Sequence, residues 1–278
     1  MTKSEIRYAH HPSDVKNYNT EQLRNHFLIS SLFEYDTVNL VYTMYDRLIV
    51  GGVLPVSKSL NLETIEELKA EYFLERRELG IINVGGRGTV RVDGTVYELG
   101  RKEALYVGRG ANKVVFERSG EEQPYFYINS APAHHSYPTK KIGRADAEVI
   151  ELGDQQYANR RTLNKLIVNS IVETCQLQMG LTELHPGNVW NTMPAHTHNR
   201  RMEAYIYFDL EAGQTISHFM GQPDETRHLF VQNLQAIISP EWSIHSGVGT
   251  SNYSFIWGMA GENLDYGDMD ALSPAELR

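Results

Sequence analysis

The chain has 278 residues, of which 41% are apolar and 22% charged, ordinary proportions for a globular protein that exclude a disordered one. The formal net charge at pH 7 is -9 and no block of lysine or arginine offsets it, which argues against nucleic acid as a partner. Cys175 is the single cysteine, so no intrachain disulfide can form. The N-terminus is polar and the apolar runs are short and broken, so we expect neither a signal peptide nor a membrane span, and we expect a cytoplasmic protein.

Taken in chain order, the elements begin with a helix signal in EQLRNHFLISSLF, residues 21–33. A β-rich region follows from about Thr37 to Ser130 and contains a second helix signal, LETIEELKAEYFL, at residues 62–74. Within this region TVRV and TVYEL alternate and are joined by Asp93-Gly94, which predicts a tight β-hairpin. We therefore predict that the first half of the chain forms short strands joined by Gly-rich turns.

A polar, turn-rich connection leads to a second β-rich region, from about Leu163 to Ala260, and a short helix signal, SPAELR, ends the chain. We place the boundary near Arg144, which divides the chain into residues 1–143 and residues 144–278. Many short strands and few helices predict an all-β protein built from barrels or sandwiches. The two halves are candidates for a duplicated barrel.

The stretch PGNVWNTMPAHTHNRRMEAYIYF carries the chemistry of the second half. His196 and His198 alternate, so on a strand both imidazoles face the same side, and a turn over 199–201 brings Glu203 beside them on the next strand. His245, in SPEWSIHSGVG, is the fourth candidate. Imidazole nitrogens and a carboxylate oxygen suit a divalent cation, and this spacing is the cupin pattern, although Trp242 stands where cupins commonly have glycine.

Strand parity places Tyr205 and Tyr207 on the same face as Glu203, so both can line a cavity beside the metal, or Tyr207 can simply fill the barrel. Cationic residues surround the motif in the sequence and indicate an anionic substrate, because guanidinium groups bind carboxylates through two parallel hydrogen bonds. They are Arg160, Arg161, Lys165, Arg200, Arg201 and Arg227. Most of these we expect at the surface; for substrate binding we select Arg227, Arg201, Lys165 and Tyr205.

Several long blocks of the chain resemble the 5-keto-4-deoxyuronate isomerases, also called 4-deoxy-L-threo-5-hexosulose-uronate ketol-isomerases. The blocks include YFLERRELGIINVGG, APAHHSYPTKK, NRRTLNK, ETCQLQMGLTEL, the metal motif itself, MGQPDETRH and SPEWSIHSGVGTSNYSFIWGMAGEN. The resemblance extends from about Leu23 to Arg278. It implies two cupin barrels (double-stranded β-helix, jelly-roll), the first metal-free, and a homohexamer. It also implies one zinc ion per subunit on His196, His198, Glu203 and His245, although these ligands suit iron, manganese or nickel as well.

The implied activity converts 5-dehydro-4-deoxy-D-glucuronate to 3-deoxy-D-glycero-2,5-hexodiulosonate in the breakdown of pectin and related polyuronates. This aldose–ketose isomerisation needs a base that moves a proton between C2 and C1, unless a hydride shifts instead. Glu225 and His228 are candidates by their nearness to the motif blocks; a tyrosine or a hydroxide on the metal is the alternative.

Three other functions remain open from the sequence. A cupin dioxygenase would hold iron on the same ligands, and a sugar-binding cupin would bind a uronate without turnover. The 5-deoxyglucuronate isomerase of inositol breakdown shares the reaction type but lacks the motif blocks.

Overall fold

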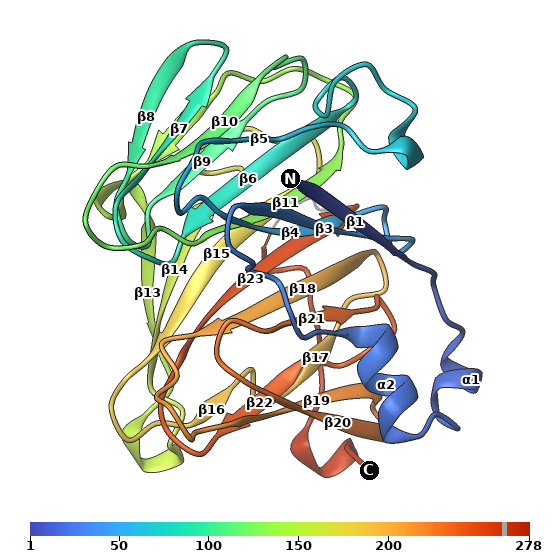
Figure 1. Ribbon diagram of the computed structural model, residues 1–278. Coiled ribbons are helices and arrows are strands. Elements are labelled where there is room, and N and C mark those ends of the chain that lie inside the picture. Colours follow the sequence, from blue (N-terminus) through green and yellow to red (C-terminus); the bar gives the residue numbers. More distant parts are fainter. Residues whose placement is uncertain (263–265) are drawn as a thin grey trace. The chain divides into compact units, whose positions relative to one another are not determined.

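The computed structural model describes residues 1–262 and 266–278, and these residues form mostly strands with a few short helices (Figure 1). The all-β class expected from the sequence is therefore confirmed. The chain divides into two compact units, each built from separate segments. The first unit comprises Met1–Arg7, Ser31–Ala147 and Leu166–Met179; the second comprises Tyr8–Ser30, Glu148–Lys165 and Gly180–Arg278. The simpler division into residues 1–143 and 144–278 stays a prediction.

The first unit contains a seven-stranded and a four-stranded sheet. In order across the larger sheet the strands are β1 (Thr2–Arg7), β3 (Thr37–Thr43), β4 (Ile49–Leu54), β11 (Phe126–Pro132), β6 (Arg77–Asn83), β9 (Ala104–Val107) and β12 (Lys140–Ile142). The smaller sheet has the order β5 (Leu60–Asn61), β10 (Val114–Arg118), β7 (Gly88–Val92) and β8 (Thr95–Leu99). Asp93 and Gly94 join β7 to β8 with positive φ angles of 46° and 89°, so the expected hairpin is confirmed.

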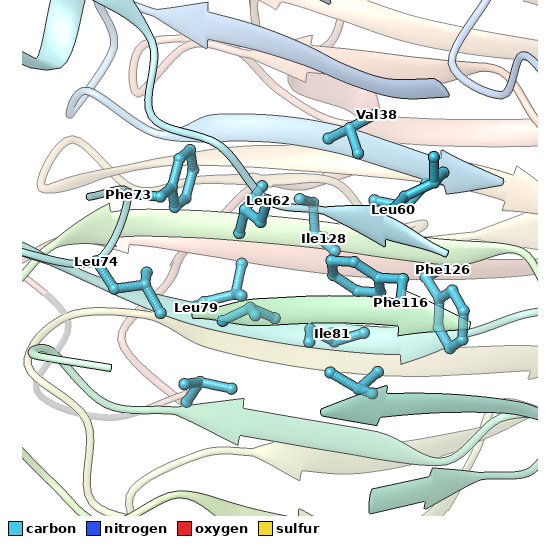
Figure 2. Close-up of a cluster of buried hydrophobic side chains, with 14 of the residues drawn as sticks. Val38, Leu60, Leu62, Phe73, Leu74, Leu79, Ile81, Phe116, Phe126 and Ile128 are labelled. Atoms are coloured by element: carbon cyan, nitrogen blue, oxygen red, sulfur yellow. The ribbon is translucent and has the colours of Figure 1, made fainter. Parts of the chain in front are cut away.

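Apolar side chains fill the interior of the first unit. Figure 2 shows this core, in which Leu79 and Ile81 of β6 lie near Phe116 of β10 and Phe126 of β11. All four side chains are fully buried, and a core packed in this way is stabilised by removal of apolar surface from water. The first barrel is thus filled by its own side chains.

The second unit is built on another seven-stranded sheet and another four-stranded sheet. The larger sheet has the order β13 (Glu148–Leu152), β14 (Arg161–Ile167), β15 (Gln178–Leu184), β23 (Ser254–Gly261), β18 (Arg201–Phe208), β21 (Ala236–Ser239) and β2 (Leu28–Ile29). The smaller one has the order β16 (Trp190–Asn191), β22 (Ser246–Gly249), β19 (Ile216–Gln222) and β20 (Glu225–Val231). A short pair, β17 (His196–Thr197) and β24 (Asp270–Ala271), completes the unit.

Helices are short. The longest is α2 (Thr20–Phe27), where Asn19 and Gln22 form a reciprocal capping box and Leu23 and Phe27 turn inward. The others are α1 (Pro12–Val15), η1 (Glu66–Leu68), η2 (Arg144–Asp146), η3 (Gln155–Tyr157) and η4 (Pro274–Glu276). The helix expected over 62–74 is wrong, because only the single turn η1 forms there. None of the helices in the described part of the chain is long and apolar enough to cross a bilayer.

Candidate metal centre

Three short pieces of backbone bring the four candidate ligands of the second unit together. His196 begins β17, and a turn leads from His198 into β18, where Glu203 is the third residue. His245 directly precedes β22. The expected strand, turn and strand arrangement is therefore what places the two histidines and the carboxylate on one side.

The donor atoms of these residues converge on one point. The Nε2 atom of His198 lies 3.1 Å from Oε2 of Glu203, and Nε2 of His245 lies 3.0 Å from the same oxygen. The Nε2 atoms of His245 and His196 are 2.9 Å apart. All four donor atoms lie within 4.8 Å of one another, and three of the four residues are buried. Within residues 1–262 and 266–278, no other group of three or more such side chains has this geometry.

The Nδ1 atoms of His198 and His245 have different hydrogen-bonding surroundings. Nδ1 of His198 is 2.9 Å from the carbonyl oxygen of Arg201, which can accept a hydrogen bond from it when Nε2 binds a metal ion. Nδ1 of His245 is buried and has no hydrogen-bond partner among the described residues.

The pKa values of His196 and Glu203 are both lowered, which favours the unprotonated forms that bind a cation. Burial, reinforced by the neighbouring His245, lowers the pKa of His196 to about 2, so the ring is neutral. Burial by itself would raise the pKa of the Glu203 carboxyl, but the facing rings of His245 and His198 outweigh it and hold that pKa well below its ordinary value. Neutral imidazoles and a charged carboxylate are what a divalent ion binds.

The donor set fits a catalytic divalent ion. Three nitrogens and one oxygen match the preferences of zinc and its neighbours in the first transition row. Two donors that each lie about 2.1 Å from an ion at right angles are about 3 Å apart, close to the separations seen here. Four such ligands leave coordination positions open for water or substrate when the ion adopts a five- or six-coordinate geometry.

The centre opens into a cavity of about 430 Å³. His196 and Glu203 form part of its wall, and Met269 and Ala271 form another part. Ala271 belongs to β24, which pairs with β17 so that His196 lies opposite Ala271. The remaining lining residues are Ile150, Leu152, Arg161, Leu163, Thr182, Thr192, Pro194, Ala195, Arg201, Tyr205, Phe255, Trp257, Met259 and Tyr266. The wall is thus mainly apolar, with two guanidinium groups and two phenols.

Two residues chosen for substrate binding, Tyr205 and Arg201, do line this cavity. Burial, together with the charge of Glu203, raises the pKa of Tyr205 well above its ordinary value, so its hydroxyl stays protonated and bonds to Thr192. The other tyrosine of this face, Tyr207, is not part of the wall, and its hydroxyl lies 2.7 Å from Nδ1 of His218. Tyr207 therefore fills the barrel.

Lys165 is not part of the cavity wall. Its Nζ lies 2.8 Å from a carboxylate oxygen of Glu148 and 5.0 Å from the ring centre of Tyr266. Lys165 thus has an acidic partner of its own.

The three residues chosen from β20 also lie outside the cavity wall. Glu225 and His228 are exposed, and Arg227 lies 2.9 Å from the Glu225 carboxylate. Arg227 also donates a hydrogen bond to the carbonyl oxygen of Lys16. β20 is an edge strand of the smaller sheet, and none of the three residues lines the cavity beside the metal centre, so their roles stay predictions.

Sequence reasoning did not select Arg161 or Tyr266, both of which line the cavity. Arg161 lies in the block NRRTLNK, and Arg161, Leu163 and Lys165 share one face of β14, so strand parity alone does not separate Arg161 from Lys165. Tyr266 follows β23 in a segment without a periodic pattern, and no signal in the sequence marks it.

The fold and the site together define a bicupin with a candidate three-histidine, one-glutamate metal centre in its second barrel. The chain belongs to the KduI/IolB family, whose model matches residues 29–271. It is 63% identical over 278 residues to a 4-deoxy-L-threo-5-hexosulose-uronate ketol-isomerase of Formosa agariphila, covering 100% of this chain and 99% of the relative. Proteins of the same name from Bacteroides fragilis and an Enterobacter species are 56% and 53% identical, and each alignment covers at least 99% of both chains.

Solved structures support the fold at low sequence identity. An IolB-like protein of Salmonella typhimurium superposes with a TM-score of 0.71 at 14% identity, covering 88% of this chain and 96% of that chain. The oxalate decarboxylase of Lactobacillus farciminis gives a TM-score of 0.57 at 10% identity, covering 81% and 79%. The resemblance to uronate isomerases inferred from the sequence is confirmed, and so is the bicupin fold.

Proposed function

We propose that the protein is a metal-dependent ketol-isomerase that converts 4-deoxy-L-threo-5-hexosulose uronate to 3-deoxy-D-glycero-2,5-hexodiulosonate during the breakdown of pectin and related polyuronates. The observation that carries this proposal is the cluster of His196, His198, Glu203 and His245, of which His196 and Glu203 line a cavity that is also lined by two arginines. The full-length identity to ketol-isomerases of that name supports the choice of reaction. A divalent ion on this cluster, together with the guanidinium groups of Arg161 and Arg201 on the cavity wall, suits a small anionic sugar acid.

A bound divalent ion supplies a Lewis acid that polarises a carbonyl oxygen and lowers the energy of negative charge on it. The chain contributes the rest of the site. Tyr205 and Tyr266 keep their protons, because burial raises the pKa of both, and they are therefore hydrogen-bond donors to sugar oxygens. The apolar side chains of Phe255 and Trp257 limit access of water to the reacting carbons.

Proton transfer between C2 and C1 needs an acceptor close to the sugar. Among the described residues that line the cavity, His196 and Glu203 are unprotonated at neutral pH, but their lowered pKa values make them weak bases and both are candidate metal ligands. Glu225 and His228 remain our sequence-based candidates, although they lie outside the cavity wall. Because neither cavity-wall residue is a strong base, a hydride shift between C2 and C1 is the alternative.

We further propose zinc as the resident ion, a homohexameric assembly and a cytoplasmic location. The three-nitrogen, one-oxygen donor set supports zinc among other divalent ions. The hexamer and the location follow from the resemblance to the uronate isomerases and from the single cysteine, Cys175, respectively.

The proposal is tested by incubating the purified, metal-analysed protein with the keto-uronate in D₂O and following the sugar by NMR. Formation of the 2,5-diulosonate with stoichiometric metal supports it, and deuterium at C1 of the product distinguishes proton transfer from a hydride shift. Oxygen uptake with cleavage of a substrate would instead identify a dioxygenase. Uronate binding without any turnover in metal-loaded protein would identify a binding protein.

A further inference from the structure

We propose that Arg161 binds the carboxylate of the substrate and thereby makes the cavity selective for sugar acids over neutral sugars. The inference rests on the proposed function, because it takes the substrate to be a uronate. Arg161 begins β14, and its side chain lines the same cavity as the metal-ligand candidates His196 and Glu203. It is partly buried, so its charge is partly removed from water.

The guanidinium of Arg161 has spare hydrogen-bonding capacity. Its Nη1 donates one hydrogen bond, of 2.8 Å, to the carbonyl oxygen of Asn159. In the part of the chain that the structure describes, no carboxylate lies within ion-pair distance of it. Burial lowers its pKa, while the phenols of Tyr266 and Tyr205 act in the opposite sense, and the group remains a cation at neutral pH. A partly desolvated cation without an acidic partner favours an anionic ligand.

The side chain of Arg201, the second arginine of the cavity, is held by contacts within the protein. Arg201 is 1% exposed, and its Nε donates to the sulfur of Met259 at 3.1 Å. Its Nη2 donates to the carbonyl oxygen of Tyr266 at 3.5 Å, and its Nη1 lies 3.9 Å from a carboxylate oxygen of Asp268. Moving this guanidinium onto a ligand would break contacts that hold the cavity wall.

The cations selected from the sequence outside the wall already have acidic neighbours. Lys165 pairs with Glu148, and Arg227 pairs with Glu225. Arg161 is therefore, among the described residues, the cavity cation whose charge is not balanced by a carboxylate of the chain.

The shape of the substrate agrees with this assignment. Its carboxylate is C6, at the opposite end of the chain from the reacting C1 and C2. Binding of C1 and C2 beside the cluster of Glu203 and the histidines leaves the carboxylate to be held elsewhere on the wall. Arg161 supplies a planar, two-pronged donor for it, which fits a carboxylate better than an ammonium does.

The test compares Arg161→Met with Arg160→Met in metal-loaded protein. Arg160 is the preceding residue, is exposed and does not line the cavity, so the same substitution there is a matched control. Steady-state kinetics on the keto-uronate give kcat and KM. Inhibition by D-galacturonate and by D-galactose, which differ at C6, measures the preference for an anion. Arg161→Lys keeps the positive charge but removes the planar guanidinium group that can donate two parallel hydrogen bonds.

We expect Arg161→Met to raise KM about 10- to 100-fold with little change in kcat, since a charge-assisted contact made equally before and during the reaction affects binding. The preference for D-galacturonate over D-galactose should fall by the same factor, and Arg161→Lys should recover part of both. Arg160→Met should behave as the wild type.

Unchanged KM and unchanged anion preference in Arg161→Met would overturn the inference, and so would the same losses in Arg227→Met instead. If the melting curve shows that Arg161→Met does not fold, Arg161→Lys is the deciding variant. A wild-type KM and a wild-type anion preference in Arg161→Lys would contradict a contact made through two parallel hydrogen bonds. Failure of the wild type to isomerise the keto-uronate would refute the proposed function alone. In that case the galacturonate preference, measured by calorimetric titration, still decides the role of Arg161.

Discussion

Replacing His198 by alanine is expected to remove most of the metal and most of the stability that the metal confers. The side chain is 3% exposed and supplies one of four convergent donors, with its Nε2 3.1 Å from the Glu203 carboxylate. Binding free energies of about 10–16 kcal/mol shared among four ligands make one ligand worth about 3 kcal/mol, or roughly 100-fold in affinity. The remaining ligands, His196, Glu203 and His245, should therefore hold the ion weakly.

The magnitude of the thermal effect follows from linkage. At free metal equal to about 100 times the wild-type Kd, binding stabilises the fold by about 2.7 kcal/mol, which corresponds to roughly 5–10 °C in Tm for a domain of this size. A variant with about 100-fold weaker affinity is half-saturated under these conditions. It then gains only about 0.4 kcal/mol, or about 1 °C.

The assay is metal content by mass spectrometry together with melting curves recorded with metal and with a chelator. His134→Ala is the control, because His134 is an exposed histidine of the first unit. The control should keep its metal and its full metal-dependent shift. Full metal occupancy and an undiminished Tm shift in His198→Ala would refute the assignment of this residue as a ligand.

Three further predictions concern acid stability, the first unit and assembly. Burial lowers the pKa of His218 to about 3, so below pH 6.5 the unfolded state takes up a proton that the folded state does not, and stability falls with falling pH. Between pH 7.5 and pH 5, denaturant titrations should show His218→Gln losing about 2 kcal/mol less than the wild type; equal losses would contradict the buried neutral ring. The Glu78 carboxylate accepts hydrogen bonds from the backbone N–H groups of Cys175, Gln176 and Leu177, so Glu78→Gln should lower the free energy of unfolding by about 3 kcal/mol with metal content unchanged. Light scattering should give six times the chain mass of 31.7 kDa, and a monomer at micromolar concentration would contradict the proposed hexamer.

The metal cluster was predictable because its signal is local. His196 and His198 are two residues apart and Glu203 follows one turn later, so the geometry of a strand and a turn is enough to bring three donors together. Only the position of His245 beside the other three ligands depends on the tertiary fold. His245 was identified as a candidate from the spacing of the cupin pattern. The all-β class was predictable for a related reason, since short alternating runs and turn residues such as Asp93-Gly94 determine hairpins locally.

The features that the sequence did not reveal depend on packing between distant segments. The stretch 62–74 has the apolar spacing of a helix. Its residues Leu62, Ile65, Phe73 and Leu74 are nevertheless buried in the core of the first unit from a mostly non-helical backbone, so this packing overrides local helix propensity. In the same way, strand periodicity does not distinguish Arg161, which lines the cavity, from Lys165, which lies on the same face of β14 but outside the cavity wall.

The short strand β2 limits how the metal-binding barrel can be transferred to another protein. Leu28 and Ile29 pair with Ile237 and Ala236 of β21, and β21 in turn pairs with the strand that carries Glu203. A gene fragment that begins at residue 148 encodes all four metal ligands but lacks this strand and α2. It would leave the backbone groups of Ala236 and Ile237 that pair with β2 without a partner and free to pair with another chain. Grafting the barrel onto another protein, or recombining two such genes at their midpoint, therefore requires residues 8–30 to be carried along.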